Sequence, residues 1–339
     1  MTAAPHPPPQ PKPVRAAALL LVVCGLCLTL IWIALASGAR PLPPAVLVQA
    51  LVAPEPGNFD HIALWQFRLP RVLAAALAGG ALALSGMLLQ SAIRNPLAEP
   101  QILGLNAGAV LMVTLATALG LAEGWGRPAL ASTGAFLAFA LVMAIASAGR
   151  GGPTPIKVTL CGIVISAFAA AITSAVLILD PDTMARLRVW LAGDLGGTNW
   201  TMLRAVVPIW TMAVLMALWI GPGLSILALG EVVATGLGLR VRRLRVMAMI
   251  CAACLCGAAV SLAGPVGFLG LLVPHILAPF TRARPLLAPL AALPLGAALL
   301  VGADTMARRL IAPAELSTGV MTGFFGAIVF IVIVSRTIR

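Results

Sequence analysis

Long uncharged stretches alternate along the chain with short segments that hold nearly all of its charged residues. A helix of about 20 residues at 1.5 Å per residue covers the roughly 30 Å of hydrocarbon in a bilayer, and the stretches are of that length. The pattern therefore predicts an all-α polytopic membrane protein. The uncharged stretches are 16–36, 72–93, 100–122, 128–149, 158–179, 205–230, 246–281, 285–303 and 316–335.

One of these stretches, 246–281, is too long for a single crossing, since a helix over it would be about 54 Å long. Gly264 and Pro265 interrupt it, and proline removes a backbone donor and clashes with the preceding turn. We therefore expect two short spans there and ten transmembrane helices in all. The first stretch ends in small residues that imitate a signal-peptidase site, but it exceeds the usual apolar core of a signal peptide, which favours a retained span.

Composition agrees with this class and limits the partners. The chain is 61% hydrophobic and 9% charged, with a mean hydropathy of +1.06, which is too apolar for a soluble core. The net charge of +12 does not indicate nucleic acid, because no basic surface with interleaved aromatics is present. Basic loops on the cytoplasmic side explain it, and they place both termini in the cytoplasm. The proline-rich residues 1–15 are expected to be a disordered tail, and 16–339 the transmembrane domain.

Enzyme signatures are absent from the sequence. It contains no GxSxG, no HExxH and no phosphate-binding loop. The spans also lack the interior acids and histidines of a proton relay, which argues against an ion-coupled secondary carrier without removing it as an alternative. An intramembrane hydrolase would need His275 and Asp304 to face each other. Energy for transport is therefore expected to come from a partner.

Two cytoplasmic segments carry candidate function. In RNPLAEP (94–100), two prolines predict a helix break after the second span. In 229–245, a short amphipathic helix beginning at Glu231 precedes Gly236 and Gly238, and four arginines follow. That loop is either an ordinary basic loop or a docking helix for a soluble partner.

Several segments resemble the FecCD-type permeases of bacterial ABC importers for ferric siderophores, haem and vitamin B12. The segments are RLPR (68–71), RNPLAEPQILGLNAG (94–108), LAGDLGG (191–197), LGEVVATGLG (229–238), GPVGFLGLLVPHI (264–276) and AELSTGVMTGFFGA (314–327). The resemblance implies the ten-helix type II importer fold in the bacterial inner membrane. It also implies a second permease copy or paralogue, two ATPase subunits and a periplasmic binding protein. Ferric siderophore is the favoured substrate, with haem and cobalamin as alternatives.

The resemblance also assigns roles to residues. The chain itself would hold no cofactor, no metal and no catalytic residue, because ATP and Mg bind to the ATPase. The short outer helix within 182–197 would help to close the periplasmic side. The binding protein would dock on Arg68, Arg71 and Arg308, with Arg309 as an extra arginine beside them. The cytoplasmic gate would be Asn95, Pro96 and Leu97. The coupling loop 229–243 would act on the ATPase through Gly230, Glu231, Ala234, Leu237 and Gly238.

Overall fold

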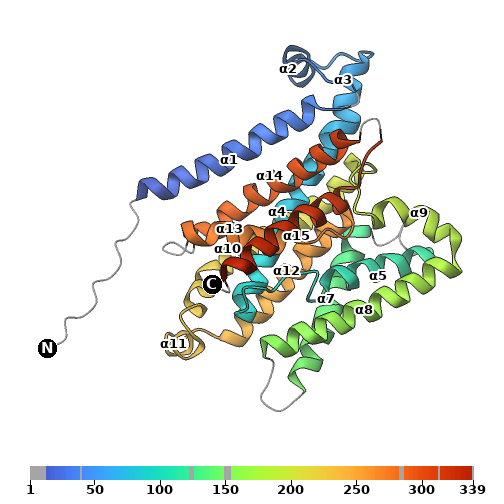
Figure 1. Cartoon of the computed structure of the whole chain (residues 1–339). Helices are drawn as coiled ribbons and strands as arrows, with labels where there is room; N and C mark the ends of the chain where they lie inside the picture. Colours follow the sequence, from blue (N-terminus) through green and yellow to red (C-terminus); the bar gives the residue numbers. More distant parts are fainter. Residues whose placement is uncertain are drawn as a thin grey trace.

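The computed structural model describes residues 13–38, 40–121, 126–148, 154–281, 286–311 and 314–337, and within these ranges every regular element is a helix (Figure 1). The predicted disordered tail lies almost entirely outside the described residues, and the first helix begins at Pro13. In chain order the helices are α1 (Pro13–Ala36), α2 (Pro44–Val52), α3 (Phe59–Ala63), the π-helix η1 (Leu64–Arg68), α4 (Leu69–Ile93), α5 (Leu105–Ala118), α7 (Arg127–Ser147), α8 (Pro155–Leu179), α9 (Pro181–Leu191), α10 (Trp200–Leu227), α11 (Glu231–Gly236), α12 (Val241–Ala263), α13 (Leu269–Thr281), α14 (Leu287–Leu310) and α15 (Thr318–Thr337).

The multi-pass membrane class is confirmed. Among the described residues, seven helical segments are long and apolar enough to cross a bilayer by length and composition: Ala17–Ala36, Phe59–Ile93, Arg127–Ser147, Pro155–Leu179, Trp200–Leu227, Val241–Ala263 and Leu287–Leu310. Three shorter apolar helices, Leu105–Ala118, Leu269–Thr281 and Thr318–Ile331, lie in the remaining predicted spans. The positions therefore match the ten predicted spans, whereas the count of ten full crossings is not reached by length alone.

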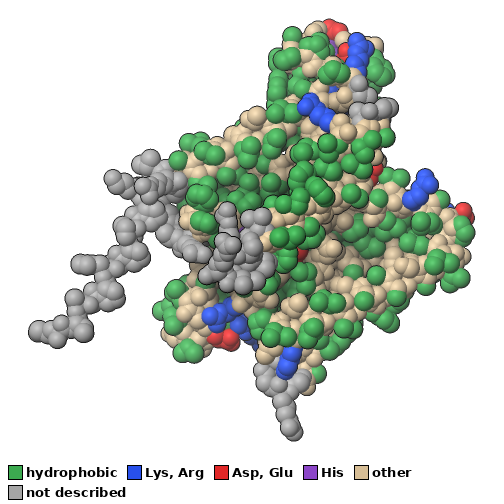
Figure 2. All heavy atoms as spheres, viewed as in Figure 1, with side chains coloured by type: hydrophobic (Ala, Val, Ile, Leu, Met, Phe, Trp, Pro, Cys, Tyr) green, Lys and Arg blue, Asp and Glu red, His purple; other side chains and the backbone are tan. Residues whose placement is uncertain are grey.

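The surface of the protein is divided into apolar sides and charged ends, as expected for membrane-spanning helices. Figure 2 shows hydrophobic side chains over the long sides of the helices, and Lys, Arg, Asp and Glu mainly near the two ends of the molecule. Helix α8 is the clearest case, since only 17% of its most apolar window is buried within the chain. Its other faces are available to lipid or to another protein chain.

The predicted interruption at Gly264 and Pro265 is confirmed. Helix α12 ends at Ala263, Gly264 has a φ of 68°, and α13 begins only at Leu269. The unwound backbone between them is buried at Gly264 and Val266, where its polar groups need partners from the protein. Asn106 supplies one, since its Nδ2 donates to the carbonyl of Val266 at 3.0 Å.

Helix α4 lies at the centre of the bundle, against α10, α12, α13 and α14 (Figure 1). Its small residues allow close backbone approach: a Cβ on Gly79 would lie 2.2 Å from the carbonyl oxygen of Gly296, and one on Gly86 would lie 2.0 Å from that of Gly270. The helix also begins earlier than predicted. It runs without a break from Phe59 through η1, so Arg68 and Arg71 lie inside a continuous helix and not at its mouth.

Candidate functional site

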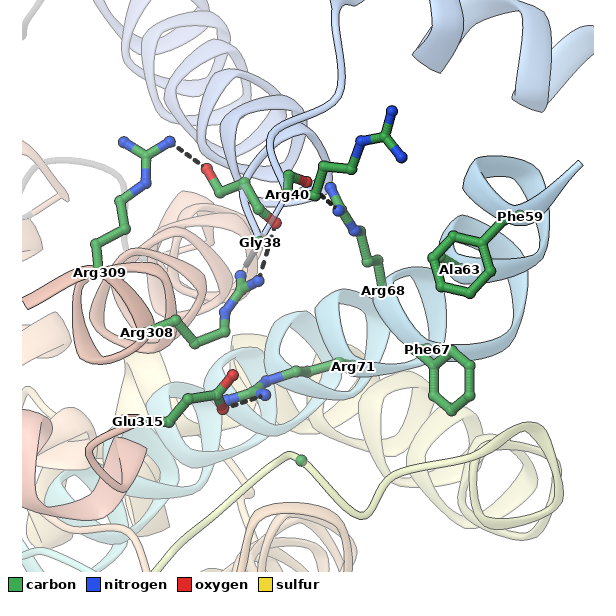
Figure 3. Close-up of a pocket in the computed structure, with 12 residues that line it drawn as sticks. Gly38, Arg40, Phe59, Ala63, Phe67, Arg68, Arg71, Arg308, Arg309 and Glu315 are labelled. Carbon is green, nitrogen blue, oxygen red and sulfur yellow. Dashed lines mark hydrogen bonds and ion pairs between the residues drawn. The ribbon is translucent and has the colours of Figure 1, made fainter. Parts of the chain in front are cut away.

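A cationic pocket lies at the end of the bundle where α1, η1, α4 and α14 meet (Figure 3). Its volume is about 730 Å³. Phe59 and Phe67, both exposed, form one side. The other side holds an unusual density of positive charge, which would attract a negatively charged partner. The arginines that line it are Arg40, Arg68, Arg71, Arg308 and Arg309.

Arg71 is the most heavily paired of these arginines. Its Nη2 lies 3.0 Å from Oδ1 of Asp304, and its Nη1 lies 2.8 Å from Oε2 of Glu315. A third carboxylate, that of Asp194, is 3.7 Å away. Only 12% of the Arg71 side chain is exposed. Its charge is therefore already balanced within the chain.

Asp304 is the centre of this network. It is 1% exposed, and Arg308 Nε lies 3.1 Å from its Oδ2, one helical turn further along α14. The hydroxyl of Thr318, at the start of α15, donates to Oδ1 at 2.9 Å. The network joins α4, α14 and α15, and its two arginines and one hydroxyl leave no buried carboxylate oxygen of Asp304 without a partner.

Arg68 and Arg308 also bind the C-terminal end of α1. Arg68 Nη1 donates to the carbonyl of Leu35 at 2.9 Å, and Arg308 Nη1 donates to that of Ser37 at 3.2 Å. The last carbonyls of a helix lack partners and carry partial negative charge, so cations are stabilising there. Arg309 donates to the Ser37 hydroxyl.

The structure thus brings all four predicted docking arginines to one pocket. They differ in how far their side chains are exposed to solvent. Arg309 is exposed, whereas the Arg308 side chain is only 7% exposed and faces Asp304. Sequence reasoning missed Asp304 and Glu315 as partners of Arg71, which are more than 230 positions away along the chain. The i, i+4 spacing of Asp304 and Arg308 was the one available signal.

The predicted gate segment lies at the opposite end of α4, about 37 Å away along the helix. Helix α4 ends at Ile93, and Arg94 adopts a left-handed conformation with φ 57°. Asn95 then turns the chain, because its Oδ1 accepts a hydrogen bond from the backbone N–H of Leu97 at 3.0 Å. Pro96 and Leu97 are exposed. The helix break is therefore confirmed, while the role of these residues as a gate stays a prediction.

Glu99, three residues beyond Pro96 in the segment 94–100, is buried although the sequence places that segment between two spans. It is 3% exposed and accepts a hydrogen bond from the backbone N–H of Phe268, which directly precedes α13. Burial raises the pKa of its carboxyl to about 7. Glu99 thus caps α13 and joins the segment after the gate to the unwound 264–268.

The predicted coupling segment forms a short helix, as the sequence predicts, while its contact with an ATPase stays a prediction. Gly230, with φ 123°, begins the turn before α11, and Gly238, with φ 82°, follows its end. Ala234 is fully buried and attaches the helix to the bundle, whereas Leu237 is 65% exposed and Val232 87% exposed. The exposed side therefore combines apolar Val232 and Leu237 with the exposed Glu231 and Thr235, which suits a contact surface for another protein.

The residues of the hydrolase alternative are both engaged elsewhere. The Nδ1 of His275 is 2.8 Å from the carbonyl of Leu271, one turn earlier in α13. Asp304 is held by two arginines and Thr318. Within the described residues no paired arrangement of the two exists for catalysis.

Known proteins resemble this chain over nearly its whole length. The FecCD transport family matches residues 26–336. The ferric enterobactin transport system permease protein of Escherichia coli (strain K12) is 37% identical over 95% of this chain and 94% of its own length. The vitamin B12 import system permease protein of Klebsiella pneumoniae subsp. pneumoniae is 35% identical over 92% of each.

A solved structure extends the likeness to the fold. Described as "An inward-facing conformation of a putative metal-chelate type ABC transporter", it superposes with a TM-score of 0.80 at 26% identity. It covers 94% of this chain, and this chain covers 99% of it. These matches, over nearly the whole helical bundle, place the chain in the FecCD transport family.

Proposed function

We propose that this chain is the permease subunit of an ATP-binding-cassette importer that carries a ferric siderophore across the bacterial inner membrane. The observation that carries the proposal is the 37% identity, over nearly both full lengths, to a ferric enterobactin permease protein. Relatives that act on Fe(3+)-citrate and iron(3+)-hydroxamate match at 36% and 34%. Haem and cobalamin stay as alternatives, the latter supported by the vitamin B12 relative.

The surfaces near the two ends of α4 support two different partners, a periplasmic binding protein at one end and an ATPase at the other. The pocket around Arg68 and Arg309 is cationic, which suits acidic side chains of a periplasmic binding protein, since guanidinium pairs with carboxylate in two hydrogen bonds. At the other end, α11 presents Val232 and Leu237 to a soluble subunit. Two ATPase subunits would bind there and hold ATP and Mg, so that this chain has no enzymatic activity of its own.

The exposed apolar helix faces fit a second permease, either identical or a paralogue, with the substrate path between the two. The substrate arrives already chelated, so the path needs no metal ligands. Both termini would lie in the cytoplasm. A reporter enzyme fused after Arg339 tests this topology, and reporter activity on the periplasmic side would contradict it.

Uptake by a strain that depends on this permease tests the function. Iron-55 complexed with enterobactin, citrate or a hydroxamate siderophore should accumulate, and accumulation should stop when ATP is depleted. Growth rescue by haem or cobalamin, without accumulation of iron-55 from the siderophore or citrate complexes, would transfer the proposal to those substrates. Uptake that survives ATP depletion but collapses with the proton gradient would replace it with the secondary carrier.

A further inference from the structure

Arg245, in the first turns of α12, contacts two elements at once. Its Nη2 lies 2.8 Å from Oε2 of Glu231, the first residue of α11. Its Nε donates to the backbone carbonyl of Ala92 at 3.2 Å. A single guanidinium therefore joins the coupling helix to the inner end of α4.

The contact on α4 is at a sensitive place. Ala92 carries one of the last four carbonyls of the helix, which have no partner within it. The N–H groups of Arg94 and Asn95 both turn back to Gln90, so they leave the Ala92 carbonyl to Arg245. The chain then passes through the left-handed Arg94 directly into the predicted gate segment.

The packing of the surrounding helices allows the Arg245 contact to move α4 and α12 together. Helices α4 and α12 pack along their length, and Ser85 Oγ on α4 donates to the carbonyl of Ala252 on α12 at 2.8 Å. By contrast, α11 is short and attached mainly through Ala234. A force applied to α11 therefore reaches the α4–α12 pair most directly through Glu231 and Arg245.

We propose that Arg245 is a positioning residue that transmits the displacement of α11 to the inner end of α4 and so to the gate segment 94–97. The inference rests on the proposed importer function. The ion pair is partly exposed, with 31% of the Arg245 and 53% of the Glu231 side chain accessible, so solvent screens it and its contribution to stability is small. Its significance is geometric, because only a guanidinium offers donors on two edges to bind Glu231 and Ala92 together.

The test uses the permease assembled with its ATPase, carrying Leu97→Cys in a background without the native cysteines. A membrane-impermeant maleimide reports the accessibility of this introduced thiol with and without ATP and vanadate. Arg245→Ala should reduce the difference between the two nucleotide states by about tenfold, while the ATPase still co-purifies. Arg245→Lys should reduce it less, and Arg204→Ala, an exposed arginine outside the coupling loop 229–243, should leave it unchanged.

Exchanging the two charges tests whether the hydrogen bond from Arg245 to Ala92 is needed in addition to the Glu231–Arg245 ion pair. Glu231→Arg combined with Arg245→Glu restores opposite charges between α11 and α12, but a glutamate cannot donate to the Ala92 carbonyl. We expect the nucleotide-dependent labelling to stay lost in this double variant, and iron-55 uptake per ATP hydrolysed to fall with it. Normal labelling differences in either Arg245→Ala or the double variant would overturn the proposal. Failure of the unsubstituted protein to bind an ATPase or to take up any tested chelate would overturn the importer function as well.

Discussion

Arg71 Nη2 lies 3.0 Å from Oδ1 of Asp304, a carboxylate with 1% of its side chain exposed. The pair connects α4, at the centre of the bundle, to α14 at the end that holds the cationic pocket. Removal of one partner from a buried pair leaves an uncompensated charge, which is costlier than the pair itself is stabilising. Arg71, which the sequence predicts only as a docking residue, therefore also stabilises the fold.

Asp304→Asn should therefore lower the free energy of unfolding by about 3–5 kcal/mol, because the buried Arg308 loses its ion-pair partner and Arg71 loses the most buried of its three carboxylates. Thermal unfolding of the purified permease, followed by tryptophan fluorescence, measures this. Asp60→Asn is the matched control, since Asp60 forms only a 3.9 Å pair with the exposed Arg40. Equal stability of the two variants would show that the network is not structural.

Among the four predicted docking arginines, Arg309 is the exposed one and can accept a new partner with least disturbance. Arg309→Glu should weaken stimulation of ATP hydrolysis by the binding protein about tenfold and leave thermal stability unchanged. Arg71→Glu should instead prevent recovery of folded permease, because it would place a fourth carboxylate among Asp194, Asp304 and Glu315. Arg204→Glu, an exposed arginine outside the pocket, is the control. Full stimulation of Arg309→Glu would remove this residue from the docking surface.

Glu99 should make stability depend on pH. Its folded pKa of about 7 lies above the ordinary value of 4.5, so its contribution is fully present below about pH 4.5 and is lost as the pH rises through 7. The melting temperature of the permease should fall between pH 5 and pH 8, and that of Glu99→Gln should fall less, since an amide remains neutral and can still accept from Phe268. The exposed Asp182→Asn should behave like the unsubstituted protein. Identical pH profiles for Glu99→Gln and the unsubstituted permease would contradict the assignment.

Val232 should matter for partner binding and not for folding, because 87% of it is exposed. Val232→Asp should weaken association with the ATPase about tenfold, as expected for a contact at the centre of an apolar interface. Val52→Asp, at an equally apolar position on α2 that is 80% exposed, provides the control. Unchanged co-purification of Val232→Asp with the ATPase would argue against α11 as the docking helix.

Gly79 should tolerate no side chain, since a Cβ there would lie 2.2 Å from the Gly296 carbonyl and force α4 away from α14. We expect Gly79→Val to cost about 1–3 kcal/mol of stability, as overpacking does in tightly packed interiors. Gly25→Val on α1 meets no atom within 4 Å and should be nearly neutral by the same unfolding measurement. A neutral Gly79→Val would mean that the two helices can separate without cost.

The sequence by itself determined the membrane class, the positions of the spans, the break at Gly264, the break after the second span at Pro96, and the stop of the short helix at Gly236 and Gly238. All of these depend on local properties: runs of apolar residues, proline that cannot donate, and glycine where the chain must turn. The tertiary structure alone decided three contacts. They are the pairing of Arg71 with Asp304, the burial of Glu99 against the N–H of Phe268 at the start of α13, and the hydrogen bond from Arg245 to Ala92. These contacts join residues far apart in the chain, and a charge in a short loop gives no local sign of whether its partner is water, another protein or a carboxylate on a neighbouring helix.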